Sequence, residues 1–570
     1  MPRDSLSVFL AVVVLTTACS ASGPSSQPKN GDAVNRGPAG DQSRALVMVA
    51  RAEPRFLSMK PVISVAGIGD NDVLRSFNAG LVLVDDSDAL RPGLAESVPQ
   101  LDTDSWRVFP DGRMETTFRL KPNLIWHDQS PLLAEDFVFS WRVYGNPDLG
   151  QSATPPLVHV EEIVAPDPRT VLIRWKRPFP DATRLEAQDF PALPRHLLAE
   201  AFQRDQAEIF SSLPYWASEY VGLGPYRLDR WEAGAFLEGE AFSGHALGRP
   251  KIDRIRVRFI GDSNAVLANV LAGEAHYTFT NAIFLQQGSV LKREWASSSQ
   301  GVVLVIPSQW RRVEIQHRPE YANSRAILDP RVRMAMAHAV DRSALNDAVF
   351  DGEGVLAESM IPPWVDYAAD LQRSVVGYPF DLRRTESLMA EAGFRPAADG
   401  VWTSPVDGRL SGEIRASNTA DFVAELSIMA AGFRQARFDV QEVPMPLRSR
   451  SDRLSRHTFA FMDIGGGGMG ESGAVPNFTA ADIGTPENLW TGRNRGGWAS
   501  SEYDRLFNAF STTLDRSERN RQIVQMMRVF SEEVGAISLY FNPIVIAHVA
   551  ALKGPRNYGA ESVATWNIYE

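Results

Sequence analysis

The chain has one cysteine, Cys19, among 570 residues, and this limits how its fold can be held together. A single thiol cannot form a disulfide within the chain, so the fold must be stabilised by buried apolar surface. A hydrophobic share of 44% and a charged share of 22% are ordinary for a globular protein. The length exceeds a usual domain of about 100 to 200 residues, which predicts several domains or one large unit with more than one lobe.

The position of Cys19 suggests a role for it. The cysteine follows an apolar run, Val8–Leu15, which is too short to span a bilayer that needs about 20 apolar residues. The segment Leu15–Cys19 resembles the lipobox of bacterial lipoproteins, in which cleavage before the cysteine leaves a lipid on the new N-terminus. This resemblance predicts a signal peptide at 1–18, a lipidated Cys19 and attachment to the cell membrane on its extracytoplasmic side. The alternative is a secretory segment with an incidental cysteine.

Two further features of composition restrict the function. Residues 20–44 are rich in Ser, Gly, Pro, Asn and Asp and cannot bury enough surface to offset the entropy of ordering, so 19–44 are predicted to form a flexible tether. The formal net charge of -11 argues against nucleic acid, whose phosphates are neutralised by Lys and Arg. The histidines do not show the spacing of a helical zinc site, and neither a metal nor a cofactor is predicted.

Residue periodicity predicts alternating strands and helices. Arginine alternates with apolar residues in Arg254–Phe259, which indicates a half-buried strand, and a helix capped by Asp262 or Ser263 follows it. Asp329 and Pro330 supply an N-cap and a first-position proline for another helix. Two more helices are expected at 381–392 and 517–534. This mixture predicts α/β lobes.

Several segments occur in an order that is typical of one known family. They are Leu90–Ser97, Phe118–Asp128, Leu133–Trp141, Leu193–Leu198, Gly222–Leu228, Asp329–Arg333 with Asp341 and Arg342, Tyr378–Gly393 and Tyr503–Leu506. Together they resemble the extracytoplasmic solute-binding proteins of ABC importers for oligopeptides, dipeptides and nickel, known as family 5. The resemblance covers nearly all of 45–570. One departure is Asp128-Gln129, where the family commonly has Asp-Gly, and this predicts a different type of turn because glutamine tolerates a positive φ poorly.

The resemblance implies a fold and a domain organisation. The fold is the α/β periplasmic-binding-protein fold of the large, three-domain type, with two lobes that close on a ligand by hinge motion. The first lobe is expected to combine 45–76, 221–305 and 537–570. An inserted domain is expected at 77–220 and the opposing lobe at 306–536.

The family also implies a function and partners. The protein is expected to be a monomer that captures a small solute, most readily an oligopeptide, and delivers it to a membrane permease and its ATPase. Two alternatives remain at this stage. The first is a lipoprotein that keeps the fold but serves in regulation or assembly. The second is a serine hydrolase, suggested by Ser263 and Ser472 in segments that lack the second glycine of a nucleophile elbow.

Candidate ligand contacts lie in the segment that corresponds to the family's ammonium-binding stretch, Phe459–Glu471. Asp463 and Glu471 are candidate partners for a ligand ammonium, since a charge-assisted hydrogen bond contributes about 1.5 to 3 kcal/mol. The glycines of this segment admit two interpretations: close approach of a ligand to the backbone, or a mobile loop. The candidate glycines are Gly465, Gly466 and Gly467.

Aromatic residues provide further candidates. Trp490 and Trp498 lie on nearby loops and are predicted to line the cleft. Trp126 and His127 are interpreted as residues that finish a strand and cover the edge of a core rather than as ligand contacts.

Overall fold

A computed structural model describes residues 45–60, 62, 71–85, 89–149, 151, 154–418, 420–446, 449 and 452–555. The predicted signal peptide, Cys19, the tether and the last part of the predicted first lobe, 556–570, lie outside the described residues. The predictions of cleavage and lipidation therefore stay predictions.

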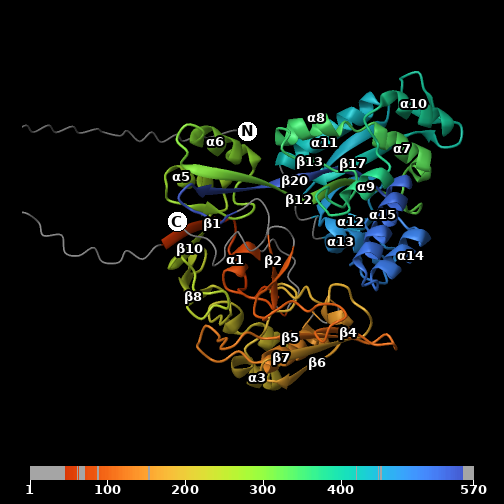
Figure 1. Cartoon of the computed structure of the whole chain (residues 1–570). Helices are drawn as coiled ribbons and strands as arrows, with labels where there is room; N and C mark the ends of the chain where they lie inside the picture. Colours follow the sequence, from red (N-terminus) through yellow and green to blue (C-terminus); the bar gives the residue numbers. More distant parts are fainter. Residues whose placement is uncertain are drawn as a thin grey trace, which may run out of the picture. The chain divides into compact units, whose positions relative to one another are not determined.

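One large sheet runs through much of the described chain. Its strand order is β18-β17-β19-β12-β20-β11-β1-β10-β9-β8, and β13 pairs with β20 off this path. The strands are β1 (Ala45–Ala50), β8 (Tyr226–Glu232), β9 (Phe236–Ala241), β10 (Arg254–Phe259), β11 (Tyr277–Thr278), β12 (Gly301–Ile315), β13 (Val355–Leu356), β17 (Ser411–Ser417), β18 (Asp439–Met445), β19 (Met462–Gly467) and β20 (Ala536–Val549). Figure 1 shows β12 and β20 crossing between the part that carries α5 and α6 and the part that carries α7 to α15.

The two crossing strands pair with each other over almost their whole length. Their antiparallel register runs from Gly301 opposite Val549 to Glu314 opposite Ala536. Pro307 lies opposite Pro543, and the register shifts immediately after Pro307. Because proline has no backbone N–H, neither residue can donate a ladder hydrogen bond at this point.

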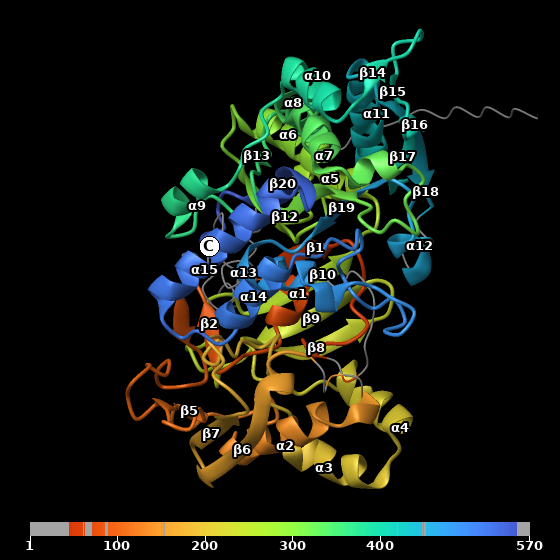
Figure 2. The same cartoon turned by 90° about the vertical axis from the view of Figure 1, so that its right-hand side faces the viewer.

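Smaller sheets and helices complete the molecule, and Figure 2 shows the residues around β5, β6 and β7 below the strands of the large sheet. The four-stranded sheet has the order β4-β5-β7-β6, with β4 (Trp106–Val108), β5 (Met114–Arg119), β6 (Val160–Asp167) and β7 (Thr170–Trp175). The other strands are β2 (Val82–Val84), β3 (Leu90–Pro92), β14 (Arg395–Pro396), β15 (Trp402–Ser404) and β16 (Gly408–Arg409).

The α-helices lie between and around these sheets. They are α1 (Asn71–Arg75), α2 (Ala134–Tyr144), α3 (Arg195–Arg204), α4 (Ala207–Ser211), α5 (Ser263–Leu271), α6 (Leu285–Trp295), α7 (Pro330–His338), α8 (Arg342–Phe350), α9 (Ala368–Ser374), α10 (Leu382–Glu391), α11 (Ala420–Gln435), α12 (Arg453–His457), α13 (Gly470–Gly473), α14 (Ser501–Phe510) and α15 (Arg516–Glu532). No described helix is both long enough and apolar enough to cross a bilayer.

In the described part of the chain, the apolar core consists of three clusters. The first joins β1 to the four-stranded sheet and its helices, and it includes Met48, Trp126 and Trp175. The second joins β1, α5 and α6 to α7, α8 and α11. The third lies among α9, α14 and α15. Since the first cluster is continuous between the predicted first lobe and the inserted domain, it does not mark the boundaries at 76/77 and 220/221, and these stay predictions.

Local sequence signals for helix ends are confirmed. The side chains of Asp262, Asp329 and Asp381 each accept a hydrogen bond from a backbone N–H in the first turn of α5, α7 and α10. Pro330 occupies the first helical position of α7. Gly393 follows α10 with a φ of +88°, a conformation that costs glycine little.

The turn at Asp128-Gln129 corrects an expectation. Gln129 has a φ of +73°. Glutamine therefore adopts the left-handed conformation that it was expected to avoid. Asp128 supports this turn, because its carboxylate accepts a hydrogen bond from the N–H of Ser130 at 3.0 Å and pairs with Nε2 of His196 at 2.7 Å.

The buried pair Trp126 and His127 is architectural, as the sequence indicated. Each is 1% exposed. The His127 ring accepts a hydrogen bond from the N–H of Gly222 at Nδ1 and donates from Nε2 to the carbonyl of Gly224. These bonds require a neutral ring, and burial lowers the pKa of His127 to about 4.

Candidate ligand-binding site

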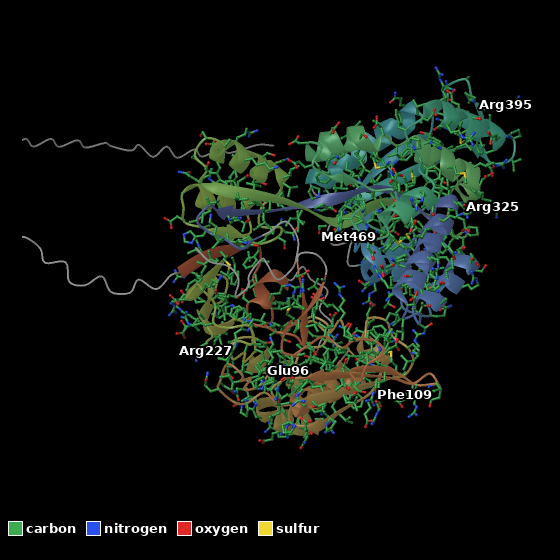
Figure 3. The ribbon with its side chains drawn as sticks, in the orientation of Figure 1. Glu96, Phe109, Arg227, Arg325, Arg395 and Met469 are labelled. Carbon is green, nitrogen blue, oxygen red and sulfur yellow. The ribbon has the colours of Figure 1, made fainter. Side chains whose placement is uncertain are left out.

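The candidate residues lie where three parallel strands of the large sheet end. β17 is parallel to both β18 and β19, so the carboxyl ends of these strands lie at one edge. Ligands of open α/β sheets bind outside this edge. Gly465, Gly466 and Gly467 belong to β19, so the mobile-loop interpretation is wrong for them. Figure 3 labels Met469, just beyond β19, on the side of the predicted opposing lobe, 306–536, that lies nearest the crossing strands.

One edge of β19 is open. β12 pairs with the whole of β19, from Met462 to Gly467. On the other side the register with β17 covers only Met462 and Asp463. Within the described residues, the ladder between β17 and β19 therefore stops before the glycines, and Gly466 and Gly467 are partly exposed there.

The missing side chains of β19 make room for charged groups of its neighbours. A Cβ at Gly465 would stand 3.4 Å from Oε1 of Glu314 and 3.7 Å from Nη1 of Arg495. At Gly467 it would stand 3.2 Å from Nη1 of Arg312. The glycines thus allow long polar side chains to lie flat against the strand.

On one face of β12 the charges form a closed set. Arg311 is 2% exposed, and its guanidinium forms a bidentate ion pair with Glu425 of α11. The hydroxyl of Tyr540 donates to the same carboxylate, and the guanidinium lies 3.9 Å from the ring centroid of Phe422. This buried pair is neutral overall and is well supplied with partners.

On the opposite face the charges are less evenly matched. Arg312 pairs with Oε1 of Glu314 at 2.7 Å, but its Nε has no hydrogen-bond partner in the described part of the chain. Arg415 pairs with Oδ2 of Asp463 at 2.8 Å. Arg495, on the loop before α14, contributes a third guanidinium over Gly465.

Asp463 is already engaged as an ion-pair partner. Its side chain is 19% exposed and lies opposite Glu314 in the register. Burial raises the pKa of Asp463 to about 6, against the opposing effect of the nearby Arg415. The structure brings Asp463 next to the glycines, and its role as an ammonium partner stays a prediction.

Glu471 lies in a second charge cluster, which also includes a residue of the predicted inserted domain. Its carboxylate accepts hydrogen bonds from Arg516 at 3.0 Å, from Arg519 at 3.2 Å and from the Tyr367 hydroxyl at 2.9 Å. Arg519 also pairs with Asp181 at 3.7 Å, which belongs to the predicted inserted domain. Glu471 is therefore neutralised by arginines, and its role with a ligand also stays a prediction.

The two tryptophans lie in different surroundings. Trp490 is partly exposed and packs against Tyr321 and His457. Trp498 is 2% exposed, and its ring packs edge-on against Tyr503 and Phe530. The indole of Trp498 is thus a core group in this structure and presents little area to a ligand. The sequence did not reveal this burial, because the residues that enclose Trp498 lie on helices that follow the loop.

The two serines weighed as nucleophiles sit in ordinary helical positions. Ser263 is the first residue of α5 after its cap Asp262, and Ser472 lies in the short helix α13. Among the described residues, no group of three or more His, Cys, Asp or Glu side chains could hold a metal ion.

Sequence reasoning missed Arg311, Arg312, Glu425 and Arg495. Glu425 is 114 residues from its partner Arg311, and such pairs leave no local pattern. One signal was present: adjacent arginines follow Trp310 in a segment that is otherwise rich in β-branched residues, so in a strand they must point to opposite faces.

Comparison with known proteins assigns the family. The model of the bacterial extracellular solute-binding proteins, family 5, matches residues 90–480. The chain belongs to this family. Family 5 proteins bind solutes rather than transform them, so the family confirms that the chain is not an enzyme, and the hydrolase alternative is wrong.

Relatives with known names support this assignment. A putative ABC transporter peptide-binding protein of Brucella ovis is 24% identical over 303 residues, 51% of this chain and 51% of that protein. The chain thus spans about half the length of this relative. The oligopeptide-binding protein AppA of Bacillus subtilis is 22% identical over 540 residues, 94% of this chain and 92% of AppA.

Solved structures confirm the predicted fold. NikZ from Campylobacter jejuni in complex with Ni(L-His) has a TM-score of 0.72 at 20% identity, covering 92% of this chain and 99% of NikZ. The oligopeptide-binding protein of Thermus thermophilus, complexed with a pentapeptide, has a TM-score of 0.71 at 23% identity, covering 92% and 96%. The chain has the α/β periplasmic-binding-protein fold, with two lobes around a ligand cleft.

Proposed function

We propose that this protein captures oligopeptides outside the cytoplasm and delivers them to the permease and ATPase of an ABC importer. In this proposal the mature chain is a monomer that Cys19 anchors to the membrane through a lipid. The named relatives support the peptide class, because those of Brucella ovis and Bacillus subtilis are named as peptide-binding proteins.

The observation that carries the proposal is the open edge of β19. A strand with unpaired backbone groups and few side chains accepts the main chain of an extended peptide by adding a strand. Ile464 to Gly467 lie beyond the register with β17, and Gly466 and Gly467 are the partly exposed residues of this edge. The main-chain bonds would supply affinity for any sequence, and Asp463 at the start of the edge would pair with the ligand ammonium.

The test is to identify what the protein holds. Native mass spectrometry of residues 25–570 as purified, followed by mild denaturation, should release a ladder of peptide masses. A short-peptide pool should also raise the melting temperature, because a ligand that binds only the folded state stabilises it. A single non-peptide mass would contradict the peptide class. An empty protein that no peptide pool stabilises would favour a role in regulation or assembly.

Asp463→Asn tests the ammonium contact separately. Loss of a charge-assisted bond should weaken the binding of peptides with a free amine at least about tenfold, which is about 1.4 kcal/mol. N-acetylated peptide amides, which carry no terminal charge, serve as the control and should bind both proteins alike. Unchanged affinity for free-amine peptides would remove Asp463 from the ammonium site.

A further inference from the structure

Arg495 is a partly buried cation without a partner. Its guanidinium has no ion pair and no side-chain hydrogen bond within the described residues. The backbone around it is nevertheless fixed. The carbonyl of Arg495 accepts from Arg318 at 2.8 Å, and the carbonyl of Gly496 accepts from the N–H of His317 at 2.8 Å. The buried amide of Asn494 donates to the carbonyls of Thr479 and Trp498. A rigid loop thus holds an uncommitted guanidinium.

The surroundings of Arg495 already carry excess positive charge. Nη1 of Arg495 would lie 3.7 Å from a Cβ on Gly465, and Nη1 of Arg312 3.2 Å from one on Gly467. On this face of the sheet three arginines, Arg312, Arg415 and Arg495, are matched by two carboxylates, Glu314 and Asp463. Burial lowers the pKa of the Arg312 guanidinium, and the positive charge of Arg495 lowers it further.

Such an arrangement costs stability unless an anion completes it. Like charges near one another disfavour the charged forms, and a buried guanidinium with an unfilled donor loses solvation without compensation. Arg312 is 4% exposed and has the unfilled donor Nε. The ordinary explanation for an unpaired arginine is full solvation, which suits the exposed Arg493 on the same loop but not the partly buried Arg495.

We infer that Arg495 binds a carboxylate of the ligand above Gly465–Gly467, with Arg312 as the buried charge behind it. The ligand is therefore a peptide with a free carboxylate next to β19, supplied either by its C-terminus or by an acidic side chain. The planar fork of a guanidinium matches a carboxylate with two parallel hydrogen bonds. The bare glycine backbone leaves room for this group to approach. This inference rests on the proposed function, since it assumes that a peptide lies along the open edge of β19.

The test compares Arg495→Gln with Arg493→Gln, which removes the same charge from an exposed position of the same loop. The probes are short alanine peptides as free acids, the same peptides as C-terminal amides, and amides that carry one glutamate. Isothermal titration calorimetry should show at least about tenfold weaker binding of the carboxylate-bearing peptides to Arg495→Gln, about 1.4 kcal/mol. Arg493→Gln should bind them like the unchanged protein. The peptide form that loses affinity identifies the source of the carboxylate.

A structural role for Arg495 predicts a different result. If the arginine serves only the fold, Arg495→Gln should lower the melting temperature of the ligand-free protein. The inference expects an unchanged or higher melting temperature, because the substitution relieves repulsion. Arg495→Lys provides a second variant that keeps the charge without the fork, and it should bind with intermediate affinity. The inference would be overturned if the unchanged protein bound the alanine amide, which has no carboxylate, as tightly as both carboxylate-bearing forms.

Failure of the proposed function can be recognised separately. If no peptide binds the unchanged protein, the peptide proposal fails and succinate alone becomes the probe. Succinate binding that Arg495→Gln loses and Arg493→Gln retains would keep the carboxylate site. The absence of succinate binding as well would overturn both.

Discussion

Arg311 and Arg312 are neighbours on β12 but lie on opposite faces of it, in contrasting surroundings. Arg311 has a bidentate carboxylate that a tyrosine hydroxyl also contacts. Arg312 shares its face with an unpaired guanidinium and keeps an unfilled donor. The first arrangement is complete without a ligand, and the second is not. The comparison teaches that the degree to which buried charges are matched, rather than their presence, separates a supporting group from a binding group.

The largest effect is expected on the completed face. Glu425→Gln leaves Arg311 as an uncompensated buried charge, so the free energy of unfolding should fall by about 3–5 kcal/mol. Urea unfolding followed by circular dichroism measures it. Glu391→Gln is the control, because its pair with Arg384 is about half exposed and should contribute less than about 1 kcal/mol. A loss at Glu425 as small as that of the control would mean that the two faces do not differ.

Alanine substitutions in β19 and at Gly468, the residue after it, test the available space around this strand. At Gly468 a Cβ would stand 2.5 Å from the carbonyl oxygen of Gly473, and backbone cannot move aside cheaply, so unfolding should become easier by about 1–3 kcal/mol. Gly466→Ala meets only the side-chain ends of Gln309 at 3.1 Å and Arg311 at 3.5 Å and should cost less than about 1 kcal/mol. Thermal unfolding ranks the variants. Equal small losses would show that the segment is as pliable as a loop.

The pH dependence of binding should distinguish the two faces next. Asp463, which faces Arg415 and Glu314 and also senses the charge of Arg311 behind the strand, takes up a proton as the pH falls through about 6, so the net charge of the incomplete face rises by one. An N-acetylated peptide with a free carboxylate should bind about threefold more tightly at pH 5 than at pH 7, the order expected for one charge roughly 10 Å away. Calorimetry at both pH values measures this change, and Asp463→Asn should abolish it.

The same group should act on stability with a defined sign. Because the pKa of Asp463 is raised in the folded state, the folded protein binds this proton more tightly than the unfolded chain does. Its contribution to stability is fully present below the unfolded pKa of about 3.9 and is lost as the pH rises through about 6. In the calorimetry at the two pH values, a peptide affinity that weakens on acidification would contradict the charges assigned to this face.

The smallest effect is expected at the ion pair between Asp181 and Arg519, which joins the predicted inserted domain to the predicted opposing lobe. Asp181 is about half exposed and pairs with Arg519 at 3.7 Å, so Asp181→Asn should change the free energy of unfolding by less than about 1 kcal/mol. Its effect should instead be on the distribution between open and closed forms, measured as the radius of gyration in small-angle X-ray scattering. A destabilisation as large as that of Glu425→Gln would mean that the ion pair of Asp181 contributes to folding like the buried pair of Arg311 and Glu425.

Much of the fold could be predicted because its signals are local. The caps of α5, α7 and α10 depend on residues within one helical turn. They could therefore be predicted from Asp262, Asp329 and Asp381. The pairing of β12 with β20 could not be read in this way, because more than 200 residues separate the strands. Gln129 shows the limit even of local rules, since contacts from Asp128 support a φ that glutamine alone disfavours.

The candidate site could be predicted only by residue type. Asp463 and the glycines were identified because a carboxylate and a bare backbone suit a peptide, and the structure places them together on β19. Their partners come from distant parts of the chain: Arg415 reaches Asp463 across 48 residues, and Arg495 lies on a separate loop. Three-dimensional packing decides which arginine remains unpaired, so this could not be predicted from the sequence.

The facing prolines of the crossing strands affect how the lobes can move. Pro307 and Pro543 face each other where the register between β12 and β20 shifts, and neither can donate a hydrogen bond, so bending at this point should break fewer hydrogen bonds than bending elsewhere along the two strands. The two-stranded connection should therefore bend mainly at these prolines, while the paired strands on either side stay stiff. We expect opening to have a low bending modulus and to leave both ends of the sheet undistorted. Dyes attached on either side of Pro307 and Pro543 would therefore report the angle between the two ends of the sheet.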